Sequence, residues 1–85
     1  GLVETEILDA SFAEQYLEVT VGTAVQWLNT SQVAHQVVFE DETIGSSAVL
    51  RRGDTFRVVF ETPGDFSFFC GPHPSMTGLV TVSAA

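Results

Sequence analysis

Short runs rich in valine, phenylalanine and threonine recur along this chain, and apolar and polar residues alternate within them. Because successive residues of a strand face opposite sides, a period of two is typical of strands with one buried face. Glycine, proline, aspartate and asparagine separate the runs and mark turns. The pattern predicts strands at Leu2 to Leu8, Tyr16 to Val21, Ala24 to Asn29, His35 to Glu40, Asp54 to Glu61, Asp65 to Cys70 and Gly78 to Ser83.

The phase of the alternation also predicts which side chains face inward. Leu17, Val19 and Val21 share one face, and Phe56, Val58 and Phe60 share another. Seven or eight strands of this kind suit an all-β sandwich of antiparallel sheets over one core. We expect the core to include Trp27, Phe12 and Phe39. The pattern of residues 44–50 leaves two options open, an irregular edge strand and a helical turn.

Length and composition indicate one domain over residues 1–85, because 85 residues with 45% hydrophobic content can build a single core. No run approaches the roughly 20 apolar residues of a membrane span. The sequence begins without methionine, from which we expect that a signal peptide or anchor was removed and that the protein is periplasmic or otherwise extracytoplasmic.

The charge balance is acidic, with eleven Asp and Glu residues against three arginines and a formal net charge of -8. This balance argues against nucleic acid and anionic membranes as partners. An acidic surface fits simple solubility, a salty habitat or docking onto a basic partner, and charge alone does not choose among them.

The segment Phe69 to Met76 reads FCGPHPSM and gathers rare residues. It contains the only cysteine, one of the two histidines and the only methionine, at C-x2-H-x2-M spacing. A lone cysteine forms no internal disulfide. Each residue alone has an ordinary structural interpretation as a small core residue, a satisfied polar group or a gap filler.

Strand phase connects this segment to the other histidine. Cys70 shares the inward phase of Phe66 and Phe68, and His35 shares that of Val37 and Phe39, so both point into the sandwich from strand ends. Two imidazoles, one thiolate and a weak thioether form a ligand set that favours copper cycling between Cu(I) and Cu(II). The spacing and phase together predict a metal site at His35, Cys70, His73 and Met76.

Two segments carry a family resemblance: HQVVFEDE from His35 to Glu42, and FSFFCGPH from Phe66 to His73, resemble plastocyanin. The segment GTAVQWLN from Gly22 to Asn29 is similar to the corresponding strand of plastocyanins and amicyanins. The short spacing between Cys70 and Met76 is similar to that of amicyanin. The chain therefore resembles the cupredoxin family over nearly its whole length.

The resemblance implies a Greek-key sandwich with a mononuclear type 1, or blue, copper site, and one-electron transfer as the function. His35, Cys70 and His73 would be the strong copper ligands and Met76 the long axial ligand. His73 would be the electron port, within an apolar docking patch of Ala34, Pro72 and Pro74. Two positions depart from the family, since Gln36 stands where Asn is usual and Phe69 where plastocyanins have Tyr.

The leading interpretation is a monomeric carrier that is not an enzyme, because the chain offers no further catalytic set. Its partner would be a redox protein such as a cytochrome or dehydrogenase. The acidic run Glu40, Asp41 and Glu42 would assist docking or be a solvated loop. Two alternatives stay open: an electron-entry domain of a larger copper oxidoreductase, and a copper-sequestering or delivery protein.

Overall fold

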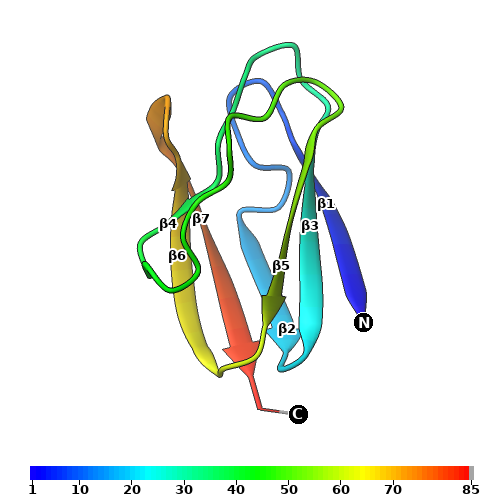
Figure 1. The fold of residues 1–85 in the computed structure, drawn as a ribbon, viewed down its shortest axis with the longest axis vertical. Helices are drawn as coiled ribbons and strands as arrows, with labels where there is room; N and C mark the ends of the chain where they lie inside the picture. The colour runs from blue at the N-terminus through cyan, green and yellow to red at the C-terminus, as the bar shows by residue number, and fades with distance from the viewer. Residues whose placement is uncertain (85) are drawn as a thin grey trace.

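Two β-sheets pack face to face in the computed structural model, which describes residues 1–84. The sheets have the strand orders β1-β3-β5 and β2-β7-β6-β4, and Figure 1 shows them closing over a common interior. The strands are β1 (Leu2–Ile7), β2 (Tyr16–Thr20), β3 (Thr23–Asn29), β4 (Val38–Phe39), β5 (Thr55–Phe60), β6 (Gly64–Cys70) and β7 (His73–Ser83). The predicted all-β sandwich is confirmed, with seven strands. Residues 1–84 include no helix with the length and apolarity needed to cross a membrane.

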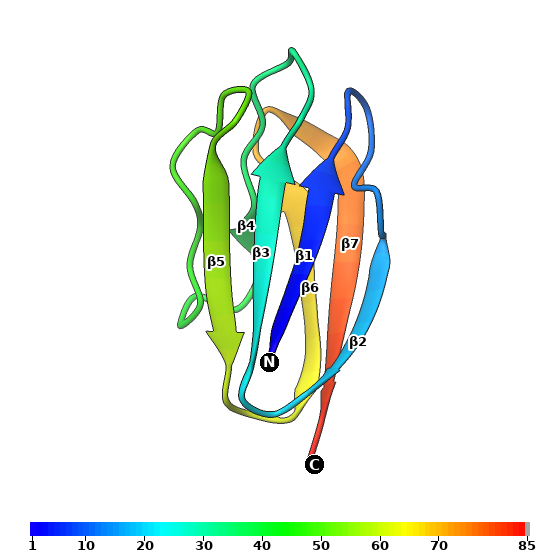
Figure 2. The same cartoon turned by 90° about the vertical axis from the view of Figure 1, so that its right-hand side faces the viewer.

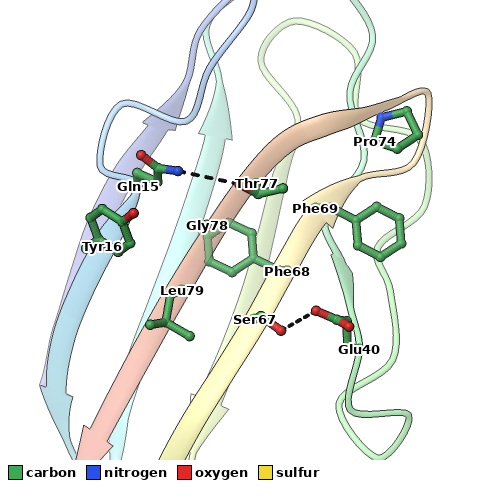
Figure 3. Close-up of a pocket in the computed structure, with 10 residues that line it drawn as sticks. All are labelled: Gln15, Tyr16, Glu40, Ser67, Phe68, Phe69, Pro74, Thr77, Gly78 and Leu79. Atoms are coloured by element: carbon green, nitrogen blue, oxygen red, sulfur yellow. Dashed lines mark hydrogen bonds between the residues drawn. The ribbon is translucent and has the colours of Figure 1, made fainter.

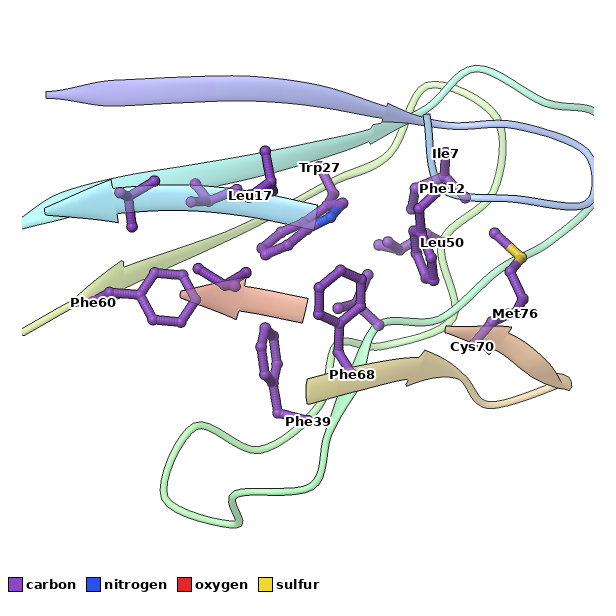
Figure 4. Close-up of a cluster of buried hydrophobic side chains, with 14 of the residues drawn as sticks. Ile7, Phe12, Leu17, Trp27, Phe39, Leu50, Phe60, Phe68, Cys70 and Met76 are labelled. Carbon is purple, nitrogen blue, oxygen red and sulfur yellow. The ribbon is translucent and has the colours of Figure 1, made fainter. Parts of the chain in front are cut away.

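Aromatic side chains fill the centre of the sandwich. Trp27 is fully buried, and its ring centroid lies 5.4 Å from that of Phe68 and 5.9 Å from that of Phe39. Phe12 packs edge-on against Phe68 with centroids 4.8 Å apart, and Figure 4 shows these rings between the two sheets. The predicted core positions of Trp27, Phe12 and Phe39 are confirmed. Because edge-to-face rings add to area burial, this cluster is a main source of stability.

The expectation of purely antiparallel sheets is wrong for two strand pairs. β1 pairs with β3 in parallel, and β2 pairs with β7 in parallel, whereas the β3–β5, β4–β6 and β6–β7 pairs are antiparallel. The reason is that the chain changes sheets after β1 and again after β2, so that β1 and β3 run in the same direction side by side (Figure 2). The residue pattern within a strand does not reveal its neighbour's direction.

The segment around the first histidine is less regular than predicted. Only Val38 and Phe39 form β4, while His35 makes a single bridge to Leu50 and Val38 a single bridge to Ser46. The ambiguous residues 44–50 therefore run as an irregular edge beside residues 35–39. The inward phase of His35 is still confirmed, because His35, Val37 and Phe39 are buried and the residues between them are half-buried.

The last strand begins earlier than predicted, at His73 instead of Gly78. Cys70 pairs directly with His73, and the register shifts between Phe69 and Cys70. The short Gly71–Pro72 turn explains the difference, because a two-residue connection lets pairing resume at once. The β6–β7 hairpin thus carries three of the four predicted metal ligands.

Gly78 lies where the hairpin meets the aromatic core, and this close approach generates a prediction. A β-carbon at Gly78 would overlap the ring of Phe68. We expect Gly78→Ala to lower the free energy of unfolding by about 1–3 kcal/mol, as overpacking of a filled core does. Denaturant unfolding of the variant and of Thr77→Ala, a change at the exposed neighbour, measures the effect. Equal stability of the two variants would contradict it.

Candidate metal centre

His35 reaches the interior from the irregular segment that precedes β4. Its backbone N–H donates to the Leu50 carbonyl at 2.9 Å, and the Leu50 N–H donates back at 2.6 Å. The side chain is fully buried. This reciprocal pair of hydrogen bonds therefore fixes the backbone from which the imidazole projects.

Cys70 and His73 face each other across the turn of the β6–β7 hairpin. Cys70 ends β6 and is fully buried, whereas His73 begins β7 and is exposed. The alternation that buries Phe68 also buries Cys70. The hairpin therefore presents one donor to the core and one at the surface.

The structure brings the donor atoms of His35, Cys70 and His73 together. The Cys70 Sγ lies 3.4 Å from Nδ1 of His35 and 3.7 Å from Nδ1 of His73, and all three donor atoms lie within 4.8 Å of one another. Ligand atoms bound about 2.0–2.3 Å from a transition metal are roughly 3.3–3.8 Å apart. The spacing and the soft thiolate with two imidazoles thus fit a copper ion.

The environment of His35 favours the neutral imidazole. Burial lowers its pKa below the ordinary 6.5, and the nearby His73 lowers it further, while the backbone of Leu8 and the carboxylate of Asp9 act in the opposite sense. Its Nε2 is buried without a hydrogen-bond partner. Because a metal binds the unprotonated ring nitrogen, this environment keeps His35 ready as a ligand.

Met76 lies three residues after His73 on β7 and is buried, between exposed Ser75 and Thr77. Figure 4 shows it at the same end of the core as Cys70. The structure therefore places the predicted thioether at the end of the sandwich that holds the three close donors.

Gln36 connects the two segments that carry these donors, although it departs from the family pattern. Its Nε2 donates to the Ser47 carbonyl at 2.9 Å. Its Oε1 occupies the place where a β-carbon on Gly71 would stand. Gln36 thus packs against the turn that follows Cys70. Sequence reasoning did not identify Ser47 and Gly71 as its partners, and the only sequence feature that pointed to them was the position of Gln36 next to His35.

The predicted docking features lie at two places on the surface. Pro72 and Pro74 are exposed beside His73, and Ala34 is half-buried. The acidic run follows β4 on the flank of the sandwich (Figure 1), where Glu40 accepts a hydrogen bond from Ser67. Hydrogen bonds from the Thr43 side chain and backbone hold the pKa of Asp41 below its ordinary value.

A shallow groove of about 530 Å³ crosses the outer face of the second sheet (Figure 3). It is lined by Gln15, Tyr16, Glu40, Ser67, Phe68, Phe69, Pro74, Thr77, Gly78 and Leu79. Phe69, the neighbour of Cys70, borders this groove and contributes an apolar ring where plastocyanins have a tyrosine. The groove and the inward-facing donors therefore occupy opposite faces of the same sheet.

Comparison with protein families gives a match over residues 2–83 to copper-binding proteins of the plastocyanin/azurin family. The chain therefore belongs to the plastocyanin/azurin family of copper-binding proteins. Amicyanin-alpha of Methylorubrum extorquens is 34% identical, covering 96% of this chain and 72% of the relative. Plastocyanin of Physcomitrium patens is 29% identical, covering 85% of this chain and 50% of the relative. The chain thus spans only part of these relatives.

Solved structures agree with this placement. A reduced amicyanin mutant superimposes with a TM-score of 0.90 at 25% identity, covering 98% of this chain and 83% of the other. A purple cupredoxin from Nitrosopumilus maritimus gives a TM-score of 0.85 at 32% identity, covering 95% of this chain and 99% of the other. The predicted cupredoxin resemblance is confirmed.

The contact between Gln36 and Gly71 generates a prediction for the apoprotein. An added methyl in Gly71→Ala displaces the Gln36 amide and breaks its bond to Ser47, so we expect a loss of about 0.5–1.5 kcal/mol in the free energy of unfolding. In a Gln36→Ala background only the β-carbon of residue 36 remains near the added methyl, at an ordinary contact distance of 3.6 Å, and the same change should cost less. A double-mutant cycle by urea unfolding measures the difference, and additive effects would rule out the contact.

Proposed function

We propose that this chain is a one-electron carrier that holds a single copper ion at His35, Cys70, His73 and Met76. The observation that carries the proposal is the convergence of three donor atoms within 4.8 Å, in a member of a copper-binding family. Copper bound there supplies the Cu(I)/Cu(II) couple. The protein makes and breaks no substrate bond, so it acts as a carrier and not as an enzyme.

The surrounding residues hold the donors in one arrangement. His35 and Cys70 are fully buried and Met76 is nearly so, which keeps water from the inner side of the site. Cys70 and His73 are paired residues of one hairpin, and His35 is bridged to Leu50. Donors fixed on paired backbone move little when the charge at the site changes, and this small reorganisation favours fast electron transfer.

His73 is the proposed route for electrons, because it alone of the three close donors is exposed. Its surroundings support docking of a partner through Pro72, Pro74 and Ala34. A cytochrome or dehydrogenase is the proposed partner, with the acidic run as an electrostatic contact for a basic surface. We further propose that residues 1–85 act as a single monomeric cupredoxin unit in the periplasm or another extracytoplasmic compartment.

The burial of the donors bears on the alternative of copper delivery. A delivery protein exchanges its metal through accessible ligands, whereas His35 and Cys70 are fully buried here. The geometry therefore supports retention of copper.

Replacement of the two sulfur residues tests the proposed ligands. The copper-loaded protein should show an intense visible thiolate-to-copper band and a reversible one-electron wave. Cys70→Ser should abolish the band, because a hydroxyl does not replace the covalent thiolate bond. Met76→Gln should keep the band and lower the reduction potential, because an amide oxygen favours Cu(II) more than a thioether does.

Visible spectroscopy and voltammetry read out both changes, with Ser75→Gln as the control that places the same amide at an exposed neighbouring position. A colourless Cu(II) form of the unaltered protein would overturn the proposed function. A potential for Met76→Gln equal to that of the control would remove Met76 from the ligand set.

The acidic run generates a prediction about partner recognition. Reaction with a basic cytochrome should slow as salt rises, because exposed charges are screened beyond a Debye length of about 8 Å at physiological ionic strength. Neutralising the run should flatten this dependence, as measured by stopped-flow kinetics for the triple variant Glu40→Gln, Asp41→Asn, Glu42→Gln. The control removes three exposed charges elsewhere through Glu4→Gln, Glu18→Gln and Asp65→Asn. Identical salt dependences of the reaction rate for the two triple variants would show that the acidic run is only a solvated loop.

A further inference from the structure

A fully buried polar side chain, Asn29, ends strand β3. Its Nδ2 donates to the carbonyls of Val33 at 2.9 Å and Leu50 at 2.8 Å. Its Oδ1 accepts from the backbone N–H of Ser31 at 2.9 Å and from the Ser31 hydroxyl at 2.8 Å. A side-chain amide has two donor hydrogens and two acceptor lone pairs, and each has a partner within hydrogen-bond distance here. The Ser31 hydroxyl also lies 2.9 Å from the Val33 carbonyl, so its one hydrogen serves either Asn29 Oδ1 or that carbonyl.

These hydrogen bonds end at the backbone on both sides of His35. The Leu50 carbonyl that accepts from Asn29 also accepts from the His35 N–H at 2.9 Å. Val33 lies two residues before His35 in the chain. Asn29 therefore holds both the loop that leads into His35 and the residue with which His35 is paired.

The segment of His35 has little other support from strand pairing. Its bridge to Leu50 is isolated, and β4 begins only at Val38. Asn29, in contrast, belongs to the central strand of its sheet, which pairs along its length with β1 and β5. Its backbone also bonds to Asp54 at 3.0 Å and to Gly53 at 2.7 Å. The side-chain amide of Asn29 thus anchors the irregular segment around His35 to the regularly paired strand β3.

We infer that Asn29 is a positioning residue for His35, which it fixes through the Leu50 and Val33 carbonyls without touching the donor atoms. This inference rests on the proposed copper ligation by His35. Because the amide is fully buried, its bonds hold the His35 backbone in the same place whatever the charge of the bound ion. The effect of Asn29 is therefore on the geometry and affinity of the site as well as on folding stability.

The variant Asn29→Asp keeps the shape of the side chain and replaces the two donor hydrogens by an oxygen that faces two carbonyls. In the apoprotein, amide hydrogen exchange followed by NMR should become at least about tenfold faster at His35 relative to Trp27, since local opening needs fewer broken bonds. In the loaded protein, copper affinity should fall about tenfold, the lower end of the range for loss of an outer support of a metal ligand. The visible band and the Cu(II) EPR spectrum should shift with it.

Two control variants separate positioning from general destabilisation. Thr5→Val alters another buried polar residue of the same sheet, whose hydroxyl has no hydrogen-bond partner, and it should leave the exchange ratio, the affinity and the spectra unchanged. Ser31→Ala removes the Ser31 hydroxyl, which contacts Asn29 Oδ1, the Val33 carbonyl and the Val33 N–H, and keeps both bonds from Nδ2. It should change the His35 exchange ratio by much less than Asn29→Asp does.

The outcomes are decisive in each direction. If Asn29→Asp accelerates exchange at His35 and Trp27 by the same factor and leaves the affinity and spectra unaltered, Asn29 has only a general structural role and the inference is wrong.

If the variant does not fold, the side-chain amide protons of Asn29 in the unaltered apoprotein provide the test. Slow exchange supports the buried network, and exchange as fast as that of exposed amides overturns it. Absence of the visible band in the unaltered protein would overturn the proposed function, whereas the apoprotein exchange ratio still tests the positioning of the His35 backbone.

Discussion

The burial of a histidine at the end of an apolar sandwich is the constraint on which the rest of the site depends. Inside such a core a charged imidazole is disfavoured and an unpaired polar group is costly. Burial lowers the pKa of His35 and so favours the neutral imidazole. The backbone N–H and carbonyl of His35 are satisfied by hydrogen bonds to Leu50. Its Nδ1 faces the Cys70 Sγ at 3.4 Å, within the converging donor set, whereas its other ring nitrogen, Nε2, is buried without a hydrogen-bond partner.

The alternation of side chains was enough to predict most strands, because burial of one face is a local property of the sequence. It gave the inward phase of Leu17 and placed Cys70 and His35 inside, and together with the C-x2-H-x2-M spacing it predicted that His35, Cys70 and His73 meet. The parallel pairs and the shortness of β4 were not predictable in this way, since they depend on where the chain changes sheets. The partners of Gln36 and Asn29 were missed because hydrogen bonds between distant segments leave no periodic signal.

The site combines two kinds of support. Cys70, His73 and Met76 come from the single β6–β7 hairpin, so a local turn sets their spacing. His35 comes from a segment that is far from them in the chain and is held by side-chain amides and a single bridge. The part of the site with strong strand pairing therefore needs few accessory residues, while the part with weak pairing depends on Asn29 and Gln36.

The two parallel strand pairs have a consequence for the order in which the molecule assembles. Parallel neighbours need long crossovers, so they form late and slow folding, whereas the β6–β7 hairpin closes a two-residue turn and forms early. Three of the four proposed donors therefore lie on an element that pairs locally, whereas His35 joins them only when segments distant in the chain meet.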